Sequence, residues 1–264
     1  MKANCLSKKK FLNLLFPVVR LGDTDAVAMF DTGAGMTLIS RGLLQSLNYK
    51  AGDEIACGNN NGMVRKLETA IVTDVRIGDI CIGNLQAIVA GEQDFDIKDD
   101  DGNPFPAQLL LGWDVISRFR WSYDKRDDSL TVEESEPANG RGTLEYSNFP
   151  IVCAEHERIS FRAGIDTGHT ESILASIWKE RLATASHAAE TVGIGSAESA
   201  VLPYAKEFSF IYHGKDFCIH DVDIFEKIHG AGDKTEALFG MDIFRGKSWT
   251  LDFPKKILDF YDFQ

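Results

Sequence analysis

Two Asp-Thr-Gly tripeptides are the residues of this chain best suited to chemistry. Asp31-Thr32-Gly33 and Asp166-Thr167-Gly168 each follow an apolar run and precede another. Average residue usage would produce one such tripeptide in about one chain in twenty of this length, so a pair in similar surroundings is informative. Two adjacent carboxyl groups can share a proton and activate a water molecule, one acting as general base and the other as general acid. Asp31 and Asp166 are therefore the predicted catalytic pair.

The surrounding sequence contains an internal repeat with two copies of one unit. The two aspartates are 166 − 31 = 135 residues apart, and the apolar segment 110–115 matches 238–243 at an offset of 240 − 112 = 128. The second copy has therefore lost seven residues in a region where loops are expected. The same offset aligns Trp121 with Trp249, which favours core packing over a binding role for both.

Hydrophobic patterns predict a mainly β structure in each copy. We expect strands at 16–20, 26–30, 37–40 and 109–111, hairpins at 70–77/80–89 and 207–212/217–222, and short helices at 41–47 and from 113 or 114. Cys81 and Cys218 occupy matching places in the two hairpins and are expected in the core. Residues 133–142 have the Pro, Asn and Gly content of a linker.

The paired motifs resemble aspartic proteases of the pepsin and retropepsin kind, with both half-sites in one chain, as in a fused retropepsin dimer. The resemblance implies an all-β, bilobal acid-protease fold with two pseudo-twofold-related β-barrel-like lobes and a few short helices. We expect an N-terminal lobe at 1–135 and a C-terminal lobe at 136–264. It also implies an aspartic endopeptidase in which Asp31 and Asp166 activate water in a cleft between the lobes.

By the same resemblance, Thr32, Gly33, Thr167 and Gly168 support the active site. The threonines correspond to hydroxyls that interlock across the lobe interface, and the glycines allow backbone amides to approach the carboxylates. Ala34 and His169 stand where pepsin-like enzymes usually have Ser or Thr. Without a hydroxyl at Ala34 the pair should be less acidic, so we expect maximal activity at mildly acidic to near-neutral pH. His169 either influences the pair or turns away from it.

Each copy has a glycine-bearing turn about thirty residues after its aspartate. The predicted flap and substrate-binding residues are Asn60, Asn61 and Gly62 in the first copy and Gly193, Ile194 and Gly195 in the second. Ordinary surface turns are the alternative interpretation.

Composition limits the classes of molecule that the protein is expected to bind and the cellular compartment in which it is expected. A net charge of −12 argues against nucleic-acid and anionic-membrane binding. Five scattered cysteines, without a signal peptide or membrane span, favour a cytoplasmic protein with reduced thiols. The six histidines show no ligand spacing, so we expect no metal and no cofactor. The expected partner is a protein or peptide substrate, and a monomer suffices for catalysis because one chain supplies both aspartates.

The alternative interpretation is a protein of a different class. The same fold could serve as a catalytically inactive peptide-binding or regulatory module. A cleft without catalysis has no physical need for two adjoining carboxylates, because their repulsion destabilises it.

Overall fold

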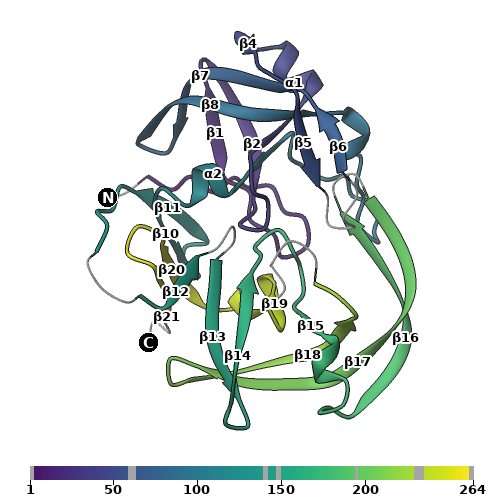
Figure 1. Cartoon of the computed structure of the whole chain (residues 1–264). Helices are drawn as coiled ribbons and strands as arrows, with labels where there is room; N and C mark the ends of the chain where they lie inside the picture. Colours follow the sequence, from purple (N-terminus) through teal and green to yellow (C-terminus); the bar gives the residue numbers. More distant parts are fainter. Residues whose placement is uncertain are drawn as a thin grey trace.

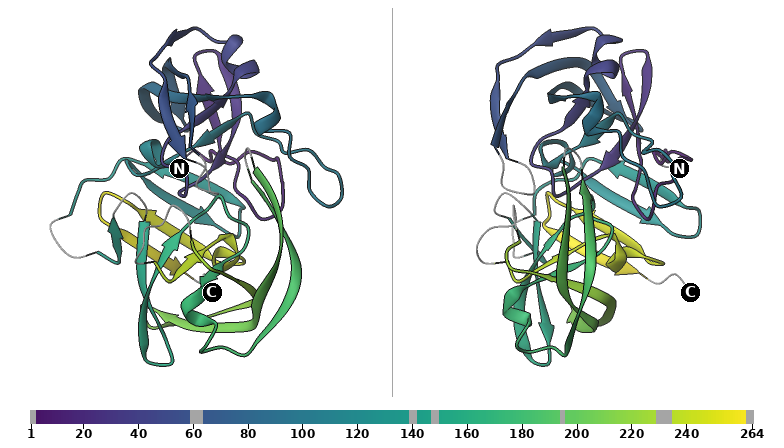
Figure 2. Two further views of the ribbon diagram at one scale, coloured as in Figure 1. Left: turned by 45° about the vertical axis from the view of Figure 1, so that its right-hand side comes forward. Right: turned by 90° about the vertical axis from the view of Figure 1, so that its right-hand side faces the viewer.

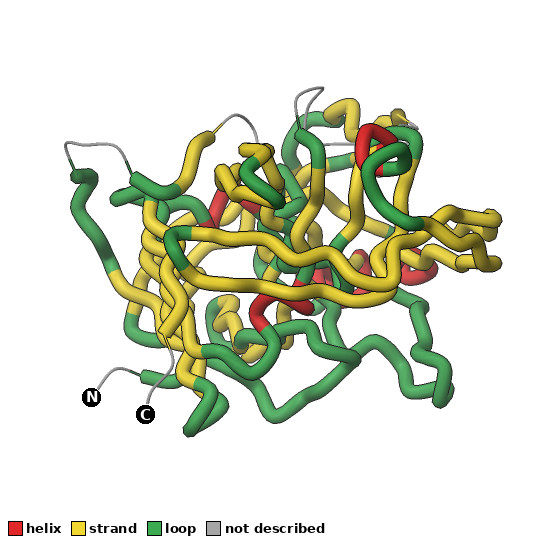
Figure 3. The backbone as a smooth tube through the Cα atoms, turned by 90° about the horizontal axis from the view of Figure 1, so that it is seen from below, coloured by secondary structure: helices red, strands yellow, loops and turns green. Residues whose placement is uncertain are grey.

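The computed structural model describes residues 3–58, 64–138, 142–146, 150–193, 196–228 and 235–261. Strands make up 54% of the chain and helices 8%, and the strands form two closed six-stranded barrels (Figure 1). Figure 3 shows how short the helical segments are. The predicted all-β, bilobal fold with few short helices is confirmed.

The first barrel is a sheet that closes on itself. The sheet has seven strands in the order β1-β2-β9-β3-β8-β7-β4, and the pairing of β1 with β7 closes the first six of them into the barrel, with β4 at the edge. The bounds are β1 Val18–Leu21, β2 Thr24–Phe30, β3 Leu38–Ser40, β4 Tyr49–Ala51, β7 Thr69–Ile77, β8 Ile80–Ala90 and β9 Leu109–Leu111. A separate hairpin, β5 Ile55–Gly58 with β6 Val64–Leu67, lies outside the barrel sheet. The helices are α1 Arg41–Gln45, η1 Glu92–Asp94 and α2 Trp113–Ile116.

The second barrel repeats this plan. Its sheet has eight strands in the order β12-β13-β14-β19-β15-β18-β17-β16, and the pairing of β13 with β17 closes the six strands from β13 to β17 into the barrel, with β12 and β16 at the edges. The bounds are β12 Leu144–Tyr146, β13 Pro150–His156, β14 Ile159–Ile165, β15 Ile173–Ala175, β16 Thr184–Gly193, β17 Ser196–Tyr212, β18 Lys215–Phe225 and β19 Ala237–Phe239. The short helices are η2 Ser176–Trp178 and η3 Met241–Phe244. β17 begins eleven residues before the expected hairpin at 207, since 207 − 196 = 11.

The seven residues missing from the second copy map to one loop. β3 and β8 coincide with β15 and β18 at an offset of 135, whereas β9 coincides with β19 at 128. The loop between β8 and β9 thus has 109 − 90 − 1 = 18 residues, and the loop between β18 and β19 has 237 − 225 − 1 = 11. The longer loop carries Phe105, whose ring lies 5.3 Å from Phe11 and 5.6 Å from Phe16. The additional residues therefore enlarge the first core.

A four-stranded sheet joins the copies. Its order is β11-β10-β20-β21, with β10 Arg120–Asp124 and β11 Ser129–Glu133 from the first copy and β20 Ser248–Asp252 and β21 Ile257–Tyr261 from the second. Trp121 and Trp249 lie on its adjacent central strands and are fully buried. Their predicted role in core packing is confirmed.

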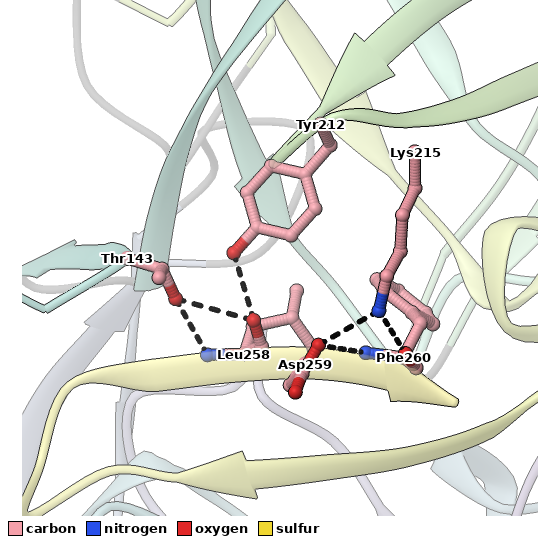
Figure 4. Close-up of polar contacts among 6 residues, drawn as sticks. All are labelled: Thr143, Tyr212, Lys215, Leu258, Asp259 and Phe260. Atoms are coloured by element: carbon pink, nitrogen blue, oxygen red, sulfur yellow. Dashed lines mark hydrogen bonds and ion pairs between the residues drawn. The ribbon is translucent and has the colours of Figure 1, made fainter.

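Side chains also tie the hairpin β17–β18 to β21 (Figure 4). The Tyr212 hydroxyl donates to the Leu258 carbonyl at 3.0 Å, and Lys215 Nζ reaches Asp259 Oδ1 at 2.9 Å and the Phe260 carbonyl. Thr143 Oγ1 accepts from the Leu258 amide at 2.8 Å. The turn of this hairpin is therefore fixed to the sheet that joins the copies.

The expectation that Cys81 and Cys218 lie in the core is wrong. Both side chains are exposed. Successive side chains of a strand point to opposite faces, and here Ile82, Phe217 and Ile219 take the inward positions. The pairing of the hairpins was predicted correctly, but the face of each cysteine was not.

None of the helices in the described ranges has the length and apolar content to cross a membrane.

Candidate active site

The two predicted aspartates occupy equivalent turns between buried strands. Asp31 directly follows β2, and its amide donates to the Leu111 carbonyl at 3.1 Å. Asp166 directly follows β14, and its amide donates to the Phe239 carbonyl at 2.9 Å. Because β9 and β19 are buried strands of their barrels, each aspartate is fixed to the core of its own copy.

Thr32 and Thr167 link the two turns by reciprocal hydrogen bonds. The amide of Thr32 donates to Thr167 Oγ1 at 3.0 Å, and the amide of Thr167 donates to Thr32 Oγ1 at 3.0 Å. Each hydroxyl then donates across the interface, Thr32 to the Ile165 carbonyl at 2.7 Å and Thr167 to the Phe30 carbonyl at 2.9 Å. Both side chains are fully buried, so these four bonds exclude water and hold the turns together.

Gly33 and Gly168 bring the aspartates together in a crossed arrangement. A Cβ added to Gly33 would overlap the carboxyl group of Asp166, and one added to Gly168 would overlap that of Asp31. Each glycine thus lies against the carboxylate of the other copy. Only the absence of a side chain allows this approach.

Hydrogen bonds and burial set the acidity of the pair. Asp31 Oδ1 accepts from the amides of Gly33 at 2.8 Å and Ala34 at 3.0 Å, and Asp166 Oδ1 accepts from the amide of Gly168 at 2.9 Å. These bonds favour the charged forms. Burial outweighs them and raises the pKa of both carboxyl groups, and the neighbouring charge of Asp166 raises the pKa of Asp31 further. Two carboxyls in such contact titrate as a unit that retains one proton over a wide pH range.

Residues 18–118 match the model of a protein family described as gag-polyprotein putative aspartyl protease. The resemblance to retropepsin-like aspartyl proteases is thereby confirmed. The match covers 118 − 18 + 1 = 101 of the 264 residues and includes the first Asp-Thr-Gly. No curated protein matches the chain. The family match supports a protease function in general terms.

Ala34 and His169, the departures from the pepsin-like pattern, keep equivalent backbone roles. The Ala34 carbonyl accepts from the Trp113 amide at 2.7 Å, and the His169 carbonyl accepts from the Met241 amide at 2.8 Å. The His169 ring bonds through Nδ1 to the Glu171 carbonyl at 2.5 Å. The imidazole is therefore engaged with its own loop.

A further pair of side-chain networks supports the two aspartate-bearing turns. Thr37 Oγ1 donates to Asp114 Oδ1 at 2.9 Å and accepts from the Gly112 amide at 3.1 Å. In the second copy Ser172 Oγ donates to Asp242 Oδ1 at 2.6 Å and accepts from the Gly240 amide at 3.1 Å. These bonds join each aspartate-bearing turn to the segment after β9 or β19.

Sequence reasoning missed Thr37 and Ser172. The repeat offset of 172 − 37 = 135 and the hydroxyl at both positions were the available signal. Asp114 and Asp242 had been recognised only as matching positions of the repeat.

Two hairpins contain the described residues that are nearest in sequence to the predicted flap positions. Gly58 pairs with Val64 at the end of β5–β6, and Gly193 pairs with Ser196 at the end of β16–β17. Asn60, Asn61 and Gly62, as well as Ile194 and Gly195, lie outside the described residues. In Figures 1 and 2 the free ends of both hairpins are directed toward the level between the two barrels.

A cavity of about 510 Å³ lies beside the base of the first hairpin. Arg41, Arg65, Glu92 and Asp94 are among its lining residues, and neither aspartate of the pair lines it. Arg65 lies 3.9 Å from Asp94, and Arg41 pairs with Glu68 at 2.9 Å. Both arginines of this cavity therefore already form ion pairs with carboxylates.

Proposed function

We propose that this chain is an aspartic endopeptidase that hydrolyses peptide bonds with a water molecule activated by Asp31 and Asp166. The observation that carries the proposal is the crossed contact of Gly33 and Gly168 with the carboxyl groups of the opposite copies. It brings together the buried Asp31 and the partly buried Asp166, two carboxyls of raised pKa. A structural role alone would not require such a costly pair.

The proposed reaction uses one charged and one protonated carboxyl. The charged carboxylate takes a proton from water while the water oxygen attacks the peptide carbonyl carbon. The protonated carboxyl gives its proton to the carbonyl oxygen, which yields a neutral tetrahedral diol. The carboxyl that took a proton from water then gives it to the amide nitrogen, while the other carboxylate accepts a proton from a diol hydroxyl, so the C–N bond breaks and an acid and an amine are released. No covalent intermediate with the protein is formed.

The rigid backbone around the pair supports this chemistry. The four threonine bonds fix the turns, so little reorganisation is required as charge shifts between the carboxyls. One chain supplies both aspartates, and a monomer is therefore the proposed catalytic unit. The proposed substrate is a protein or peptide bound between the lobes under the hairpin ends. All five cysteines are free, which supports the proposal of a cytoplasmic, reducing setting.

The test is cleavage of a mixed peptide library across a range of pH. We expect cleavage with a maximum at mildly acidic to near-neutral pH, block by a statine-type transition-state analogue, and losses of about 100-fold or more in Asp31→Asn and Asp166→Asn. Asp124→Asn, which alters a partly exposed carboxylate on β10 outside the aspartate pair, serves as the matched control and should retain activity.

The outcome that contradicts the proposal is equally specific. Binding of peptides or of the analogue without cleavage at any pH would support the inactive peptide-binding module. A maximum at strongly acidic pH would contradict only the inference drawn from Ala34.

A further inference from the structure

Three potential metal ligands gather on the outer face of the second barrel. Glu207 of β17 lies directly opposite His220 of β18, and Cys218 is two residues before His220 on the same face. One ligand atom from each side chain lies within 4.8 Å of the other two. The expectation of no metal rested on spacing along the chain, whereas this group is formed by pairing across two strands.

Strand alternation explains why these side chains meet in solvent. Phe208, Phe217 and Ile219 take the inward positions and are buried, so Glu207, Cys218 and His220 all face outward and are exposed. The turn of the hairpin is fixed to β21 by Tyr212 and Lys215. The backbone that carries the three ligands is therefore held in place.

We propose that Glu207, Cys218 and His220 bind a zinc-class divalent cation, with water completing a tetrahedral site. A set of thiolate, imidazole and carboxylate suits Zn²⁺, whereas Mg²⁺ and Ca²⁺ prefer oxygen ligands alone. On binding, the Cys218 thiol loses its proton to solvent and the sulfur bonds to the metal.

The distance between the two strongest donors fits this cation. Zn–S bonds of about 2.3 Å and Zn–N bonds of about 2.05 Å at a tetrahedral angle separate sulfur and nitrogen by about 3.6 Å. Cys218 Sγ and His220 Nε2 are 3.7 Å apart. The cation can therefore bind both with little movement of either strand.

Ser209 supplies an outer contact of the kind that metal sites use. Its hydroxyl donates to Glu207 Oε1 at 3.1 Å and leaves the other carboxylate oxygen available. Ser209 also lies directly opposite Cys218 in the strand pairing. Such a bond orients a ligating carboxylate and raises metal affinity.

The corresponding hairpin of the first barrel provides a matched control. Cys81 and Cys218 both lie near the start of the second hairpin strand, although the offset of 135 between β8 and β18 aligns Cys81 with Asp216, two residues before Cys218. Cys81 is also exposed, but it pairs with Arg76, a cation that opposes metal binding. Zinc is therefore expected at the second hairpin alone.

The test is calorimetric titration of the full chain with Zn²⁺ under reducing conditions. We expect one ion per chain, a loss of at least about tenfold in affinity in Cys218→Ser and His220→Gln, and a loss of about 10- to 100-fold in Ser209→Ala. Cys81→Ser should bind as the unaltered chain does. All four positions are exposed or partly exposed polar sites, and circular dichroism would verify that each variant is folded.

A second readout identifies the ligand directly. Zn²⁺ should slow alkylation of Cys218, measured by mass spectrometry of peptides, and leave the alkylation of Cys81 unchanged. Absence of saturable binding, or equal affinity in Cys218→Ser and Cys81→Ser, would overturn the proposal. Because neither readout requires proteolysis, the result is independent of the proposed peptidase activity.

Discussion

The hairpin β5–β6 of the first copy and the hairpin β16–β17 of the second occupy the same place in the repeat but are built differently. In the first copy β4 ends at Ala51 and β5 begins at Ile55, so the strand is interrupted by three residues. In the second copy β16 runs without a break over the equivalent span, from Thr184 to Gly193. Figure 1 shows this long, curved ribbon beside the second barrel.

Local sequence explains the difference. The break in the first copy contains Gly52, Asp53 and Glu54, and residues of these types are poor strand formers. The equivalent positions of the second copy are His187, Ala188 and Ala189. The Gly52 amide donates to the Thr69 carbonyl at 2.8 Å, so the pairing of β4 with β7 extends one residue beyond Ala51 before the strand ends.

The two aspartate-bearing turns, in contrast, agree in the hydrogen bonds of their threonine and supporting side chains. The threonine bonds and the Thr37 and Ser172 networks have the same partners in both copies. The comparison teaches that the requirement for two facing carboxyls constrains the turns, while the hairpins were free to diverge.

The largest expected effect is loss of the shared threonine bonds. Thr32→Val leaves the Ile165 carbonyl and the Thr167 amide buried without a partner and should lower the free energy of unfolding by about 2–4 kcal/mol. Thr167→Val should cost a similar amount if the two turns are equivalent. Denaturant unfolding measures both, and Thr32→Ser, which keeps the hydroxyl, serves as the control. A large difference between the two valine variants would break the equivalence.

The supporting networks should respond equally in the two copies. Asp114→Ala leaves the buried Thr37 without its acceptor, and Asp242→Ala does the same to Ser172, so each should lower the free energy of unfolding by about 1–3 kcal/mol. Asp124→Ala, which alters a partly exposed carboxylate that pairs with the exposed Arg126, should have a smaller effect. Unequal losses in thermal unfolding would show that one turn depends less on its network.

The aspartate pair should reduce stability at neutral pH. Its folded-state pKa is raised above the ordinary value of 3.8, so the folded protein loses stability as pH rises from that value through the raised pKa. Asp31→Asn removes this cost and should raise the free energy of unfolding at neutral pH by the order of 1 kcal/mol. The gain should vanish below 3.8.

Asp124 provides a control in which the same substitution should change the free energy of unfolding in the opposite direction. Arg126 lowers the pKa of Asp124 to about 2, so its stabilisation is present above the ordinary value of 3.8 and is lost as pH falls toward 2. Asp124→Asn should therefore lower stability at neutral pH. A neutral-pH loss in Asp31→Asn as well would contradict the raised pKa of the pair.

The smallest expected effect concerns an ion pair that is present beside the second hairpin and absent at the equivalent described positions beside the first. His187 Nε2 lies 2.6 Å from Asp223 Oδ1, whereas the first copy has Gly52 and Ile88 at the equivalent positions. A double-mutant cycle of His187→Ala and Asp223→Ala should give a coupling of about 0.2–1 kcal/mol in thermal unfolding, because the pair is partly exposed. A coupling of zero would mean that strand continuity alone maintains the long hairpin.

Much of this fold could be predicted from the sequence because it is encoded locally or by repetition. The duplicated Asp-Thr-Gly and the two offsets predicted two equivalent β units, and apolar alternation predicted the hairpin strands of the first copy closely. The seven-residue deletion was also visible, but its assignment to the loop after β18 required the strand bounds.

Other features were decided by the tertiary structure. The outward faces of Cys81 and Cys218 depend on strand register, which a one-residue shift reverses. The contacts of Thr37 with Asp114 and of Glu207 with His220 join residues distant in the chain. Sequence alone determined which groups are present and how they repeat. Only the paired strands determined which of them meet, because hydrogen-bonded register sets both the neighbour and the face of every side chain.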